Sequence, residues 1–336
     1  METKSRHPAT LSVVAPVFNE ARIIAAFVDE AQQQLCDIPA LGGWEIVLVD
    51  DGSTDGSAEI LDAAAQRYPG RVKVLHLARN FGHTAAVSAG LDHASGDAVV
   101  LMDSDLQDDP KAIPRMVEKW REGYRVVYAI RSSREEPVWK RLLFTSFYRL
   151  LRMLSDTPFP VDAGNYSLMD RRVVEILQGL PERNRYLPGV RAWAGFRQVG
   201  LAVPRRPRHD DRPRVGIRGL WRLSMNAIFS FSYVPLLIFR LIGAFSLGLS
   251  LLLMSYAIGY KLFSTSTIPA WTSQIVAVSF FGGLNIFGIG ILGEYIARIY
   301  DELKGRPVYV IDRRVAAAPD ACDSATRSHS HSRNAA

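Results

Sequence analysis

Short apolar runs alternate with stretches of helical spacing along the first part of the chain. Apolar, often β-branched runs that predict buried strands lie at 11–17, 44–49, 72–77 and 98–102, and segments of helical spacing lie at 21–35, 58–68 and 85–94. This alternation is typical of a mostly parallel sheet with helices on both faces. We therefore predict an α/β fold that binds its ligands at the carboxyl ends of the strands.

Beyond residue 110 the alternation loosens. We predict a helix at 113–122, a strand at 125–130, a basic and aromatic helical stretch at 139–154 and a further helix at 171–180. An arginine-rich stretch comes next and leads to the apolar part of the chain. One substantial domain therefore ends near residue 222, and the chain beyond that residue has a different composition.

Apolar residues concentrate in the last third of the chain. Residues 241–260 and 271–293 contain no charged side chain, and each run is about 20 residues long, enough to cross a bilayer. We predict two transmembrane helices there, with two buried core helices as the alternative. The run at 223–240 is shorter and contains Pro235, which favours an interfacial helix and leaves a third span open.

The distribution of charged residues predicts how the two membrane helices are oriented. Lys and Arg number 40 against 34 Asp and Glu, a net charge of +6, and arginines crowd between residues 171 and 222. The loop between the two predicted spans carries only Lys261, so the positive-inside rule places both termini and the main domain in the cytoplasm. We expect a multi-pass protein of the bacterial inner (plasma) membrane. No zinc-ligand pattern, basic zipper or aromatic RNA-binding signature accompanies the arginines, which argues against nucleic acid as a partner.

The termini and cysteines fit this picture. Cys36 and Cys322 provide no disulfide framework, and the N-terminal segment has no apolar signal-peptide core. The expected parts are a cytoplasmic domain at 1–222, an interfacial helix at 223–240, transmembrane helices at 241–260 and 271–293, a cytoplasmic segment at 294–315 and a disordered tail at 316–336.

Two carboxylates come directly after the fourth predicted strand. Asp103 and Asp105 are two residues apart, so a turn can aim both at one hard cation and leave positions for diphosphate oxygens. This predicts a Mg²⁺ or Mn²⁺ site shared with a phosphate-bearing substrate. An isolated Asp-x-Asp pair is weak evidence, because in most sequences such a pair is a solvated turn. The other motifs of the chain therefore decide between the two interpretations.

Four motifs occur in order at the predicted strand ends. They are Pro16-Val17-Phe18-Asn19-Glu20, Val49-Asp50-Asp51-Gly52-Ser53-Thr54-Asp55, Arg79-Asn80-Phe81-Gly82 and Met102-Asp103-Ser104-Asp105-Leu106-Gln107-Asp108-Asp109-Pro110. Together they resemble family-2 glycosyltransferases. The closer resemblance is to the polyprenyl-phosphate glycosyltransferases, a group that includes bactoprenol glucosyltransferases and dolichol-phosphate mannose synthase. It covers about residues 10 to 312, and chance explains four ordered motifs poorly.

The resemblance implies a GT-A-type nucleotide-sugar-binding domain. The substrate-binding residues it implies are Pro16, Phe18, Glu20, Val49 and Asp51 around the base and ribose, together with Ser104 and Gln107. Asp51 would accept a hydrogen bond from the base, while Val49 and Phe18 would pack on the ring. A helix-capping turn is the alternative role for Asp50, Asp51 and Asp55.

Arg131 matches a strand-end arginine of the family that pairs with the diphosphate or sugar, with a surface ion pair as its alternative. On the acceptor side, the segment from Asp162 to Leu168 resembles the family's Asp-x-Gly-Asp-Phe-Arg-Leu but has Asn165 and Ser167 at two of its positions. An amide cannot take up a proton at neutral pH, so Asp162 is the remaining candidate for a general base. A lipid phosphate is already largely anionic at neutral pH, and a base is then unnecessary.

Two further arginines precede the apolar part of the chain. Arg212 and Arg218 keep the spacing of two cations in the family, although the Ser-Lys-Tyr expected nearby is missing. A cationic loop at this position can hold a nucleotide diphosphate and a lipid phosphate near the membrane. Positive-inside charge is the alternative explanation.

The implied activity is metal-dependent, inverting transfer of one sugar from a nucleotide-diphosphate sugar to polyprenyl (undecaprenyl) phosphate, for cell-envelope glycan modification. Glucose from UDP is the expected donor, while GDP-mannose, UDP-N-acetylhexosamine and UDP-aminoarabinose stay open. A processive polysaccharide synthase is disfavoured because the Gln-x-x-Arg-Trp segment of those enzymes is missing. Asp103 and Asp105 argue against a non-catalytic membrane scaffold. Homo-oligomer formation is left open.

Overall fold

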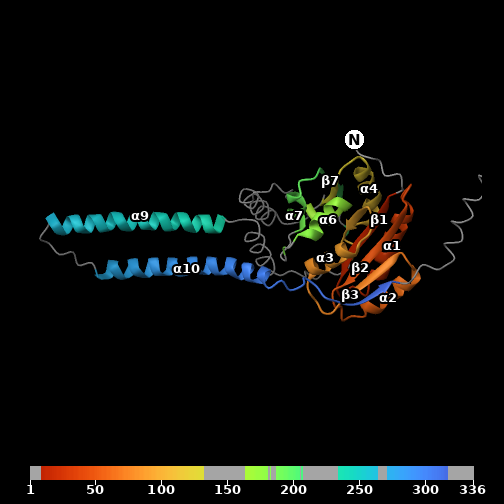
Figure 1. The fold of residues 1–336 in the computed structure, drawn as a ribbon, viewed down its shortest axis with the longest axis horizontal. Helices are drawn as coiled ribbons and strands as arrows, with labels where there is room; N and C mark the ends of the chain where they lie inside the picture. The colour runs from red at the N-terminus through yellow and green to blue at the C-terminus, as the bar shows by residue number, and fades with distance from the viewer. Residues whose placement is uncertain are drawn as a thin grey trace, which may run out of the picture. The chain divides into compact units, whose positions relative to one another are not determined.

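The computed structural model describes residues 9–131, 163–180, 182, 187–204, 206, 234–263 and 271–316. These residues fall into two compact units (Figure 1). One is an α/β unit, which also takes in the chain from Arg306 onward, and the other is a helical unit that ends at Gly305. All strands that the structure describes belong to the α/β unit.

Strands and helices alternate through the α/β unit, as the apolar pattern predicts. Its elements are β1 (Thr10–Val17), α1 (Ile24–Cys36), β2 (Gly43–Asp50), α2 (Ser57–Arg67), β3 (Val72–Leu77), α3 (His83–His93), β4 (Ala98–Leu101), η1 (Pro110–Ala112), α4 (Ile113–Arg121), β5 (Val126–Arg131), β6 (Ala163–Asp170), α6 (Arg171–Gly179), α7 (Leu187–Trp193), β7 (Gln198–Val203) and β8 (Ile311–Ala316). The four strands predicted for the first part are confirmed. β1 is buried from Leu11 to Val17, as expected of a strand covered on both faces.

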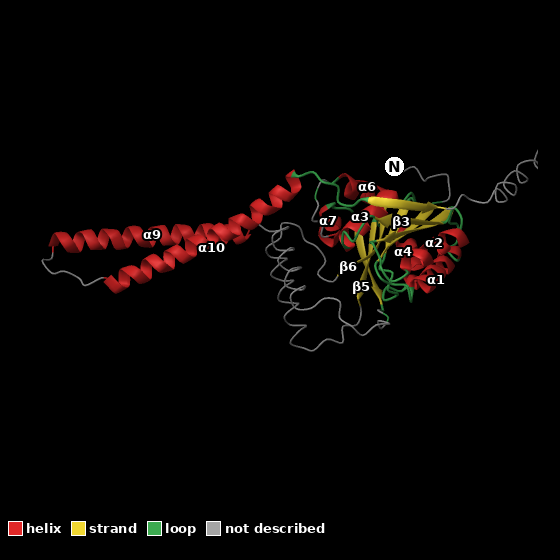
Figure 2. Ribbon diagram, turned by 90° about the horizontal axis from the view of Figure 1, so that it is seen from below, coloured by secondary structure: helices red, strands yellow, loops and turns green. Residues whose placement is uncertain are grey.

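One eight-stranded sheet crosses the unit in the order β7-β5-β6-β4-β1-β2-β3-β8. The neighbours β4, β1, β2 and β3 are parallel, and Pro16 of β1 lies opposite Val49 of β2. β6 is antiparallel to both β4 and β5. Helices α1, α2 and α4 pack together on one face, and α3 and α6 on the other (Figure 2). The carboxyl ends of the four parallel strands therefore share one edge of the sheet.

The strand at one edge of the sheet comes from the far end of the chain. β8 pairs antiparallel with β3, and Arg313 lies opposite His76. The sequence pattern predicts no strand here, because only the partly buried Ile311 and Val315 follow an inward alternation and the residues between them are exposed. An edge strand needs little apolar surface of its own when its backbone hydrogen bonds are satisfied by the neighbouring strand. The segment predicted as 294–315 thus contains the end of a helix and most of a sheet strand.

The helical unit consists of α9 (Val234–Phe263) and α10 (Trp271–Leu303). α9 begins inside the segment predicted to be a separate interfacial helix at 223–240. Pro235 occupies its first turn, where the missing N–H removes no hydrogen bond of the helix. Large apolar side chains are exposed along both helices, with Phe245 at 72% and Ile286 at 73%. Such surfaces are unfavourable in water and suit an apolar environment.

Membrane-spanning capacity differs between the two helices. Among the described residues, one helical segment is long and apolar enough to cross a membrane, Phe280–Leu303, and a shorter apolar segment is Phe239–Leu253. The predicted span at 271–293 overlaps the first of these, and the predicted span at 241–260 overlaps the second. One candidate membrane helix is therefore found within α10, while a second span stays a prediction.

Gly288 of α10 lies against the ring of Phe239 of α9, and a Cβ atom at this position would overlap that ring. We expect Gly288→Leu to weaken the packing of the two helices by about 1–3 kcal/mol, because the ring and the new side chain cannot share the space. Thermal unfolding in detergent, followed by circular dichroism, measures the effect. Gly290→Leu is the matched control, since nothing lies within 4 Å of its added Cβ. Equal losses in both variants would contradict the contact.

Candidate active site

Four loops meet where the parallel strands end. They come after β1, β2, β3 and β4 and occupy residues 18–23, 51–56, 78–82 and 102–109. Because these four strands are neighbours in the sheet, the four sequence motifs come together in space, as we predict from the strand ends. Side chains and backbone groups of the loops contact one another directly.

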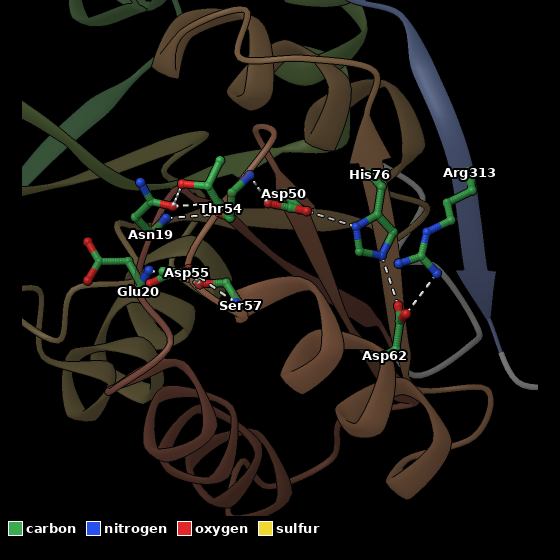
Figure 3. Close-up of polar contacts among 10 residues, drawn as sticks. Asn19, Glu20, Asp50, Thr54, Asp55, Ser57, Asp62, His76 and Arg313 are labelled. Carbon is green, nitrogen blue, oxygen red and sulfur yellow. Dashed lines mark hydrogen bonds and ion pairs between the residues drawn. The ribbon is translucent and has the colours of Figure 1, made fainter.

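The loops after β1 and β2 are joined by hydrogen bonds (Figure 3). Asn19 has a left-handed backbone with φ of 55°. Its N–H donates to Ser53 Oγ (3.0 Å), and its side-chain oxygen accepts the N–H of Thr54 (2.8 Å). The N–H of Glu20 donates to Ser57 Oγ (3.0 Å). These exchanged side-chain and backbone contacts make one rigid platform of the two loops.

Asp50 at the end of β2 and Asp55 in the loop after it hold the turns of that loop. Asp50 Oδ1 accepts the N–H of Ser53 (2.9 Å), and Asp55 Oδ1 accepts the N–H of Ser57 (3.1 Å), the first residue of α2. Burial raises the pKa of Asp55, but hydrogen bonds from Ser57 and from the N–H of Ala21 outweigh it, so the pKa is lowered. Asp55 therefore lies in the turn at the start of α2, while the N-cap residue of that helix is Gly56, which provides no side-chain cap.

Asp51 connects the loop after β2 to the loop after β3. It is 3% exposed, and its Oδ1 accepts the N–H of Phe81 (2.7 Å) while its Oδ2 accepts that of Gly82 (3.0 Å). Burial raises the pKa of this carboxyl more than the two backbone donors lower it. A carboxylate can accept further bonds beyond these two. The predicted hydrogen bond from a nucleotide base to Asp51 stays a prediction.

The other residues predicted around the base differ in accessibility. Pro16 and Val49 are buried in the sheet, and the Val49 side chain lies beside Gly90 of α3. Glu20 is partly buried, and its carbonyl accepts N–H groups at the start of α1. Phe18 is 38% exposed directly after β1. Of these four, Phe18 offers the open apolar surface on which a ring can pack.

The turn after β4 buries some of its side chains and leaves others accessible. Ser104 is buried and donates its hydroxyl to the carbonyl of Pro16 (2.9 Å). Gln107 is also buried, and its N–H donates to Asp105 Oδ1 (3.1 Å). Asp103 and Asp105 stay partly exposed. Ser104 therefore fixes the turn to β1 while the two carboxylates remain accessible, and substrate contacts of Ser104 and Gln107 stay predictions.

His83 faces the first of these aspartates, and sequence reasoning did not single it out. It is the first residue of α3, and its Nε2 lies 3.0 Å from Asp103 Oδ1. Burial lowers the His83 pKa, but the hydrogen bond and charge of Asp103 and the charges of Asp51 and Asp105 raise it more, so the pKa is raised. Its place directly after the third motif is the signal that could have identified it.

The donor set of Asp103 and Asp105 suits a hard divalent cation. Carboxylate oxygens are the ligands that Mg²⁺ and Mn²⁺ favour, and both side chains are partly exposed. Among the described residues, no group of three or more His, Cys, Asp or Glu side chains could hold a metal ion alone. A cation at this turn would therefore take its remaining ligands from the substrate diphosphate and from water.

β6 carries the segment predicted to face the acceptor. Asn165 is partly buried, and Ser167 is fully buried and donates its hydroxyl to the carbonyl of Asn165 (2.9 Å). Tyr166 donates to the carbonyl of Asp109 (2.9 Å). Burial and nearby aspartate charges hold the Tyr166 pKa well above its usual range, so its hydroxyl stays protonated. β6 is thereby fastened to the loop that carries Asp103.

Of the arginines predicted to act on phosphates, Arg131 lies within the described residues. It ends β5, where its backbone pairs with that of Val203 in β7. Arg212, Arg218 and the candidate base Asp162 lie outside the described residues. Their roles therefore stay predictions.

Two other arginines make contacts that the sequence did not indicate. Arg206 lies between two carboxylates, with Nη1 2.7 Å from Glu30 and Nη2 2.8 Å from Asp109. Arg191 is fully buried, and its Nη2 donates to the carbonyl of Gly164 (3.3 Å). Arg206 thus fastens the arginine-rich stretch to the loop after β4, and Arg191 supports the strand that carries the acceptor segment.

Comparison with known proteins agrees with this geometry. The model for Glycosyl transferase family 2 matches residues 12–177. Glycosyltransferase YkcC of Bacillus subtilis is 40% identical over 312 residues, covering 92% of this chain and 95% of that protein. The SfII prophage-derived bactoprenol glucosyl transferase of Shigella flexneri is 38% identical (90% and 97% covered). The undecaprenyl-phosphate 4-deoxy-4-formamido-L-arabinose transferase of Pseudomonas aeruginosa is 32% identical (94% and 93% covered). The chain, whose α/β unit has a GT-A-like fold, belongs to glycosyl transferase family 2.

Proposed function

We propose that this protein transfers a single sugar from a nucleotide-diphosphate sugar to a polyprenyl phosphate, with inversion at the anomeric carbon. The observation that carries the proposal is the pair of accessible carboxylates, Asp103 and Asp105, at the edge where four strand-end loops meet. Two relatives that match nearly the whole chain are named as transferases acting on bactoprenol or undecaprenyl phosphate. Their similarity extends through the apolar helices, where a lipid substrate would be reached.

The donor would lie across the four loops. Phe18 and Asp51 are available at the nucleotide end, and Asp103 and Asp105 at the diphosphate end. A Mg²⁺ or Mn²⁺ ion bound by the two carboxylates would neutralise charge on the departing nucleotide diphosphate. His83 lies beside this pair, with its Nε2 3.0 Å from Asp103 Oδ1.

The reaction needs little acid–base chemistry from the protein. An oxygen of the lipid phosphate attacks the anomeric carbon as the bond from that carbon to the diphosphate oxygen breaks, which yields the lipid-linked sugar and the nucleotide diphosphate. The attacking oxygen is anionic at neutral pH, so Asn165 at the place of an aspartate in β6 is compatible with turnover. Arg131, Arg212 and Arg218 are proposed to bind the two phosphate groups, and Asp162 is the candidate base if one is used.

Glucose from UDP is the donor we propose, supported by the name of the Shigella relative. The Pseudomonas relative is named for a modified arabinose, so proteins that share this level of sequence identity can differ in the sugar that they transfer. GDP-mannose and UDP-N-acetylhexosamine are further alternatives, because sugar choice rests on a few pocket contacts.

We propose two membrane spans, with the catalytic unit and both termini in the cytoplasm of a bacterium. β8 comes after α10 and pairs with β3, so the chain before and after the two helices lies on the same side of any membrane it crosses. The number of crossings is then even, which supports a second span in α9. Reporters fused after Lys261 and after Ile311 test this; a cytoplasmic signal at Lys261 would contradict it.

The activity is tested with purified full-length protein, undecaprenyl phosphate and each common nucleotide sugar, read by mass spectrometry of the lipid. One hexose per lipid is expected with UDP-glucose. A polymer would favour a processive synthase, and donor binding without any lipid product would favour a scaffold. If no nucleotide sugar yields a lipid-linked product, the proposal is wrong.

A further inference from the structure

Four charged side chains form a line from the end of β2 to the strand β8 (Figure 3). Asp50 Oδ2, at the end of β2, lies 2.8 Å from Nδ1 of His76 on β3. His76 Nε2 lies 2.8 Å from Oδ1 of Asp62 on α2. Asp62 Oδ2 accepts a hydrogen bond from Nη1 of Arg313 on β8 at 2.7 Å. Four elements that are separate in sequence thus share one chain of ion pairs.

These contacts require a protonated His76. A neutral imidazole has one N–H and one acceptor nitrogen, so it could satisfy only one of two carboxylates. Burial lowers the His76 pKa, and so does the charge of Arg313, but the hydrogen bonds with Asp50 and Asp62 raise it more, so the pKa is raised. Burial raises the pKa of Asp50, yet bonds from His76 and Ser53 lower it below its usual value. The line therefore carries alternating negative and positive charges.

Asp50 connects this line of charged side chains to the loops of the candidate site. It is 3% exposed, and its second oxygen accepts the N–H of Ser53 (2.9 Å). The Ser53 hydroxyl in turn accepts the N–H of Asn19 after β1, and the neighbouring Asp51 holds the loop after β3. A rotation of Asp50 would therefore displace the turn on which both neighbouring loops rest.

We propose that His76 and Arg313 are positioning residues for donor binding, an inference that rests on the proposed function. His76 is 4% exposed and is too deep to touch a nucleotide, so it acts by holding Asp50. Arg313 acts one step further away by holding Asp62 against His76. β8 follows the apolar helices in the chain. Through Arg313 it helps to hold the loops at the nucleotide end of the site.

The inference predicts a pH dependence of definite sign. The fold favours protonated His76, so its contribution is complete below the ordinary histidine pKa of 6.5 and is lost as the pH rises through the raised value. The charged groups that face the imidazole are Asp50, Asp62 and Arg313. The donor KM should therefore rise over the pH range in which His76 loses its proton, while kcat changes little. This rise is called the pH-dependent limb below. Arg313 holds Asp62, whose hydrogen bond raises the His76 pKa more than the charge of Arg313 lowers it, so removing Arg313 should move the limb to lower pH.

The test compares full-length Arg313→Ala, Arg313→Lys and Arg314→Ala between about pH 6 and pH 9. We expect Arg313→Ala to raise the donor KM about two- to fivefold, with kcat within a factor of about two, and to shift the midpoint downward. Arg313→Lys should restore both values, because it keeps the charge. Arg314 is exposed on the same strand, so Arg314→Ala removes the same charge and should behave as wild type.

His76→Asn provides a second test, and thermal unfolding shows whether this buried variant is folded. It should abolish the pH-dependent limb and raise the donor KM at least about tenfold. Equal donor KM and equal midpoints in Arg313→Ala and Arg314→Ala would overturn the inference. Calorimetric titration of the same variants with UDP and Mn²⁺ tests the positioning role separately from the proposed function. Suppose that wild type binds UDP more tightly than Arg313→Ala does but makes no lipid-linked sugar. The positioning role would then be supported, and only the proposed function would be refuted.

Discussion

Asp103→Ala is expected to lower kcat/KM for sugar transfer by about 10²- to 10³-fold. Asp103 is one of two partly exposed carboxylates in the turn after β4, and its loss removes an oxygen ligand of the proposed cation. His83 would remain beside the gap, since its Nε2 now lies 3.0 Å from Asp103. One imidazolium cannot replace a divalent cation. Transfer of labelled sugar to undecaprenyl phosphate at saturating Mn²⁺ measures the effect.

Asp37→Asn is the matched control for this experiment. Asp37 is exposed and ends α1, away from the strand-end loops, so its replacement removes one carboxylate without touching the candidate site. Its activity should stay within about twofold of wild type, whereas Asp105→Asn should resemble Asp103→Ala. Wild-type activity that persists in excess EDTA, or that survives in Asp103→Ala, would contradict the proposed metal site.

Gly52→Ala is expected to lower the free energy of unfolding by about 2–5 kcal/mol. Gly52 has φ of 70°, a left-handed conformation that costs a residue with a side chain about 1–2 kcal/mol. An added Cβ would also lie 2.7 Å from backbone atoms of Arg79 and Asn80. Backbone cannot rotate away as a flexible side chain can. The loops after β2 and β3 would have to separate, which should weaken the Asp51 contacts and donor binding as well.

Gly123→Ala separates the cost of the left-handed backbone from the cost of the steric overlap. Gly123 has φ of 97° in the turn after α4, and nothing lies within 4 Å of its added Cβ. This variant should lose only the conformational part, about 1–2 kcal/mol, and should keep its affinity for UDP. Denaturant unfolding followed by tryptophan fluorescence, with calorimetric titration of UDP, measures both quantities. If the two variants lose equal stability and affinity, close approach of the loops is not what requires glycine at position 52.

The parallel part of the fold was predictable because its signals are local. A buried run, a turn and a helical period each occupy a short stretch of sequence, and their order predicts which loops share an edge. β8 was missed for the opposite reason. Its partial apolar pattern means little until β3 is beside it, and Arg313 contacts Asp62 from 251 residues away. Periodicity carries no information about pairing over such a distance.

Within the candidate site, residue types were predictable but orientations were not. Val49 of β2 and Ser104 and Gln107 of the turn after β4 are all buried. A motif does not reveal which of its side chains the fold directs inward. His76 and His83 were overlooked because their roles depend on carboxylates from other elements. The role of a histidine near a strand end can be recognised only after the fold has placed its carboxylate partners beside it.

The position of β8 at the end of the chain also bears on how the protein is made. Ile311–Ala316 leaves the ribosome after both apolar helices, so β3 presents an unpaired backbone edge while those helices are being synthesised. Exposed edges of this kind recruit other strands and favour aggregation. Truncation before α9 to obtain a water-soluble catalytic fragment would remove the strand together with the helices. Joining residues 306–316 back to such a fragment through a flexible linker would cover the edge again.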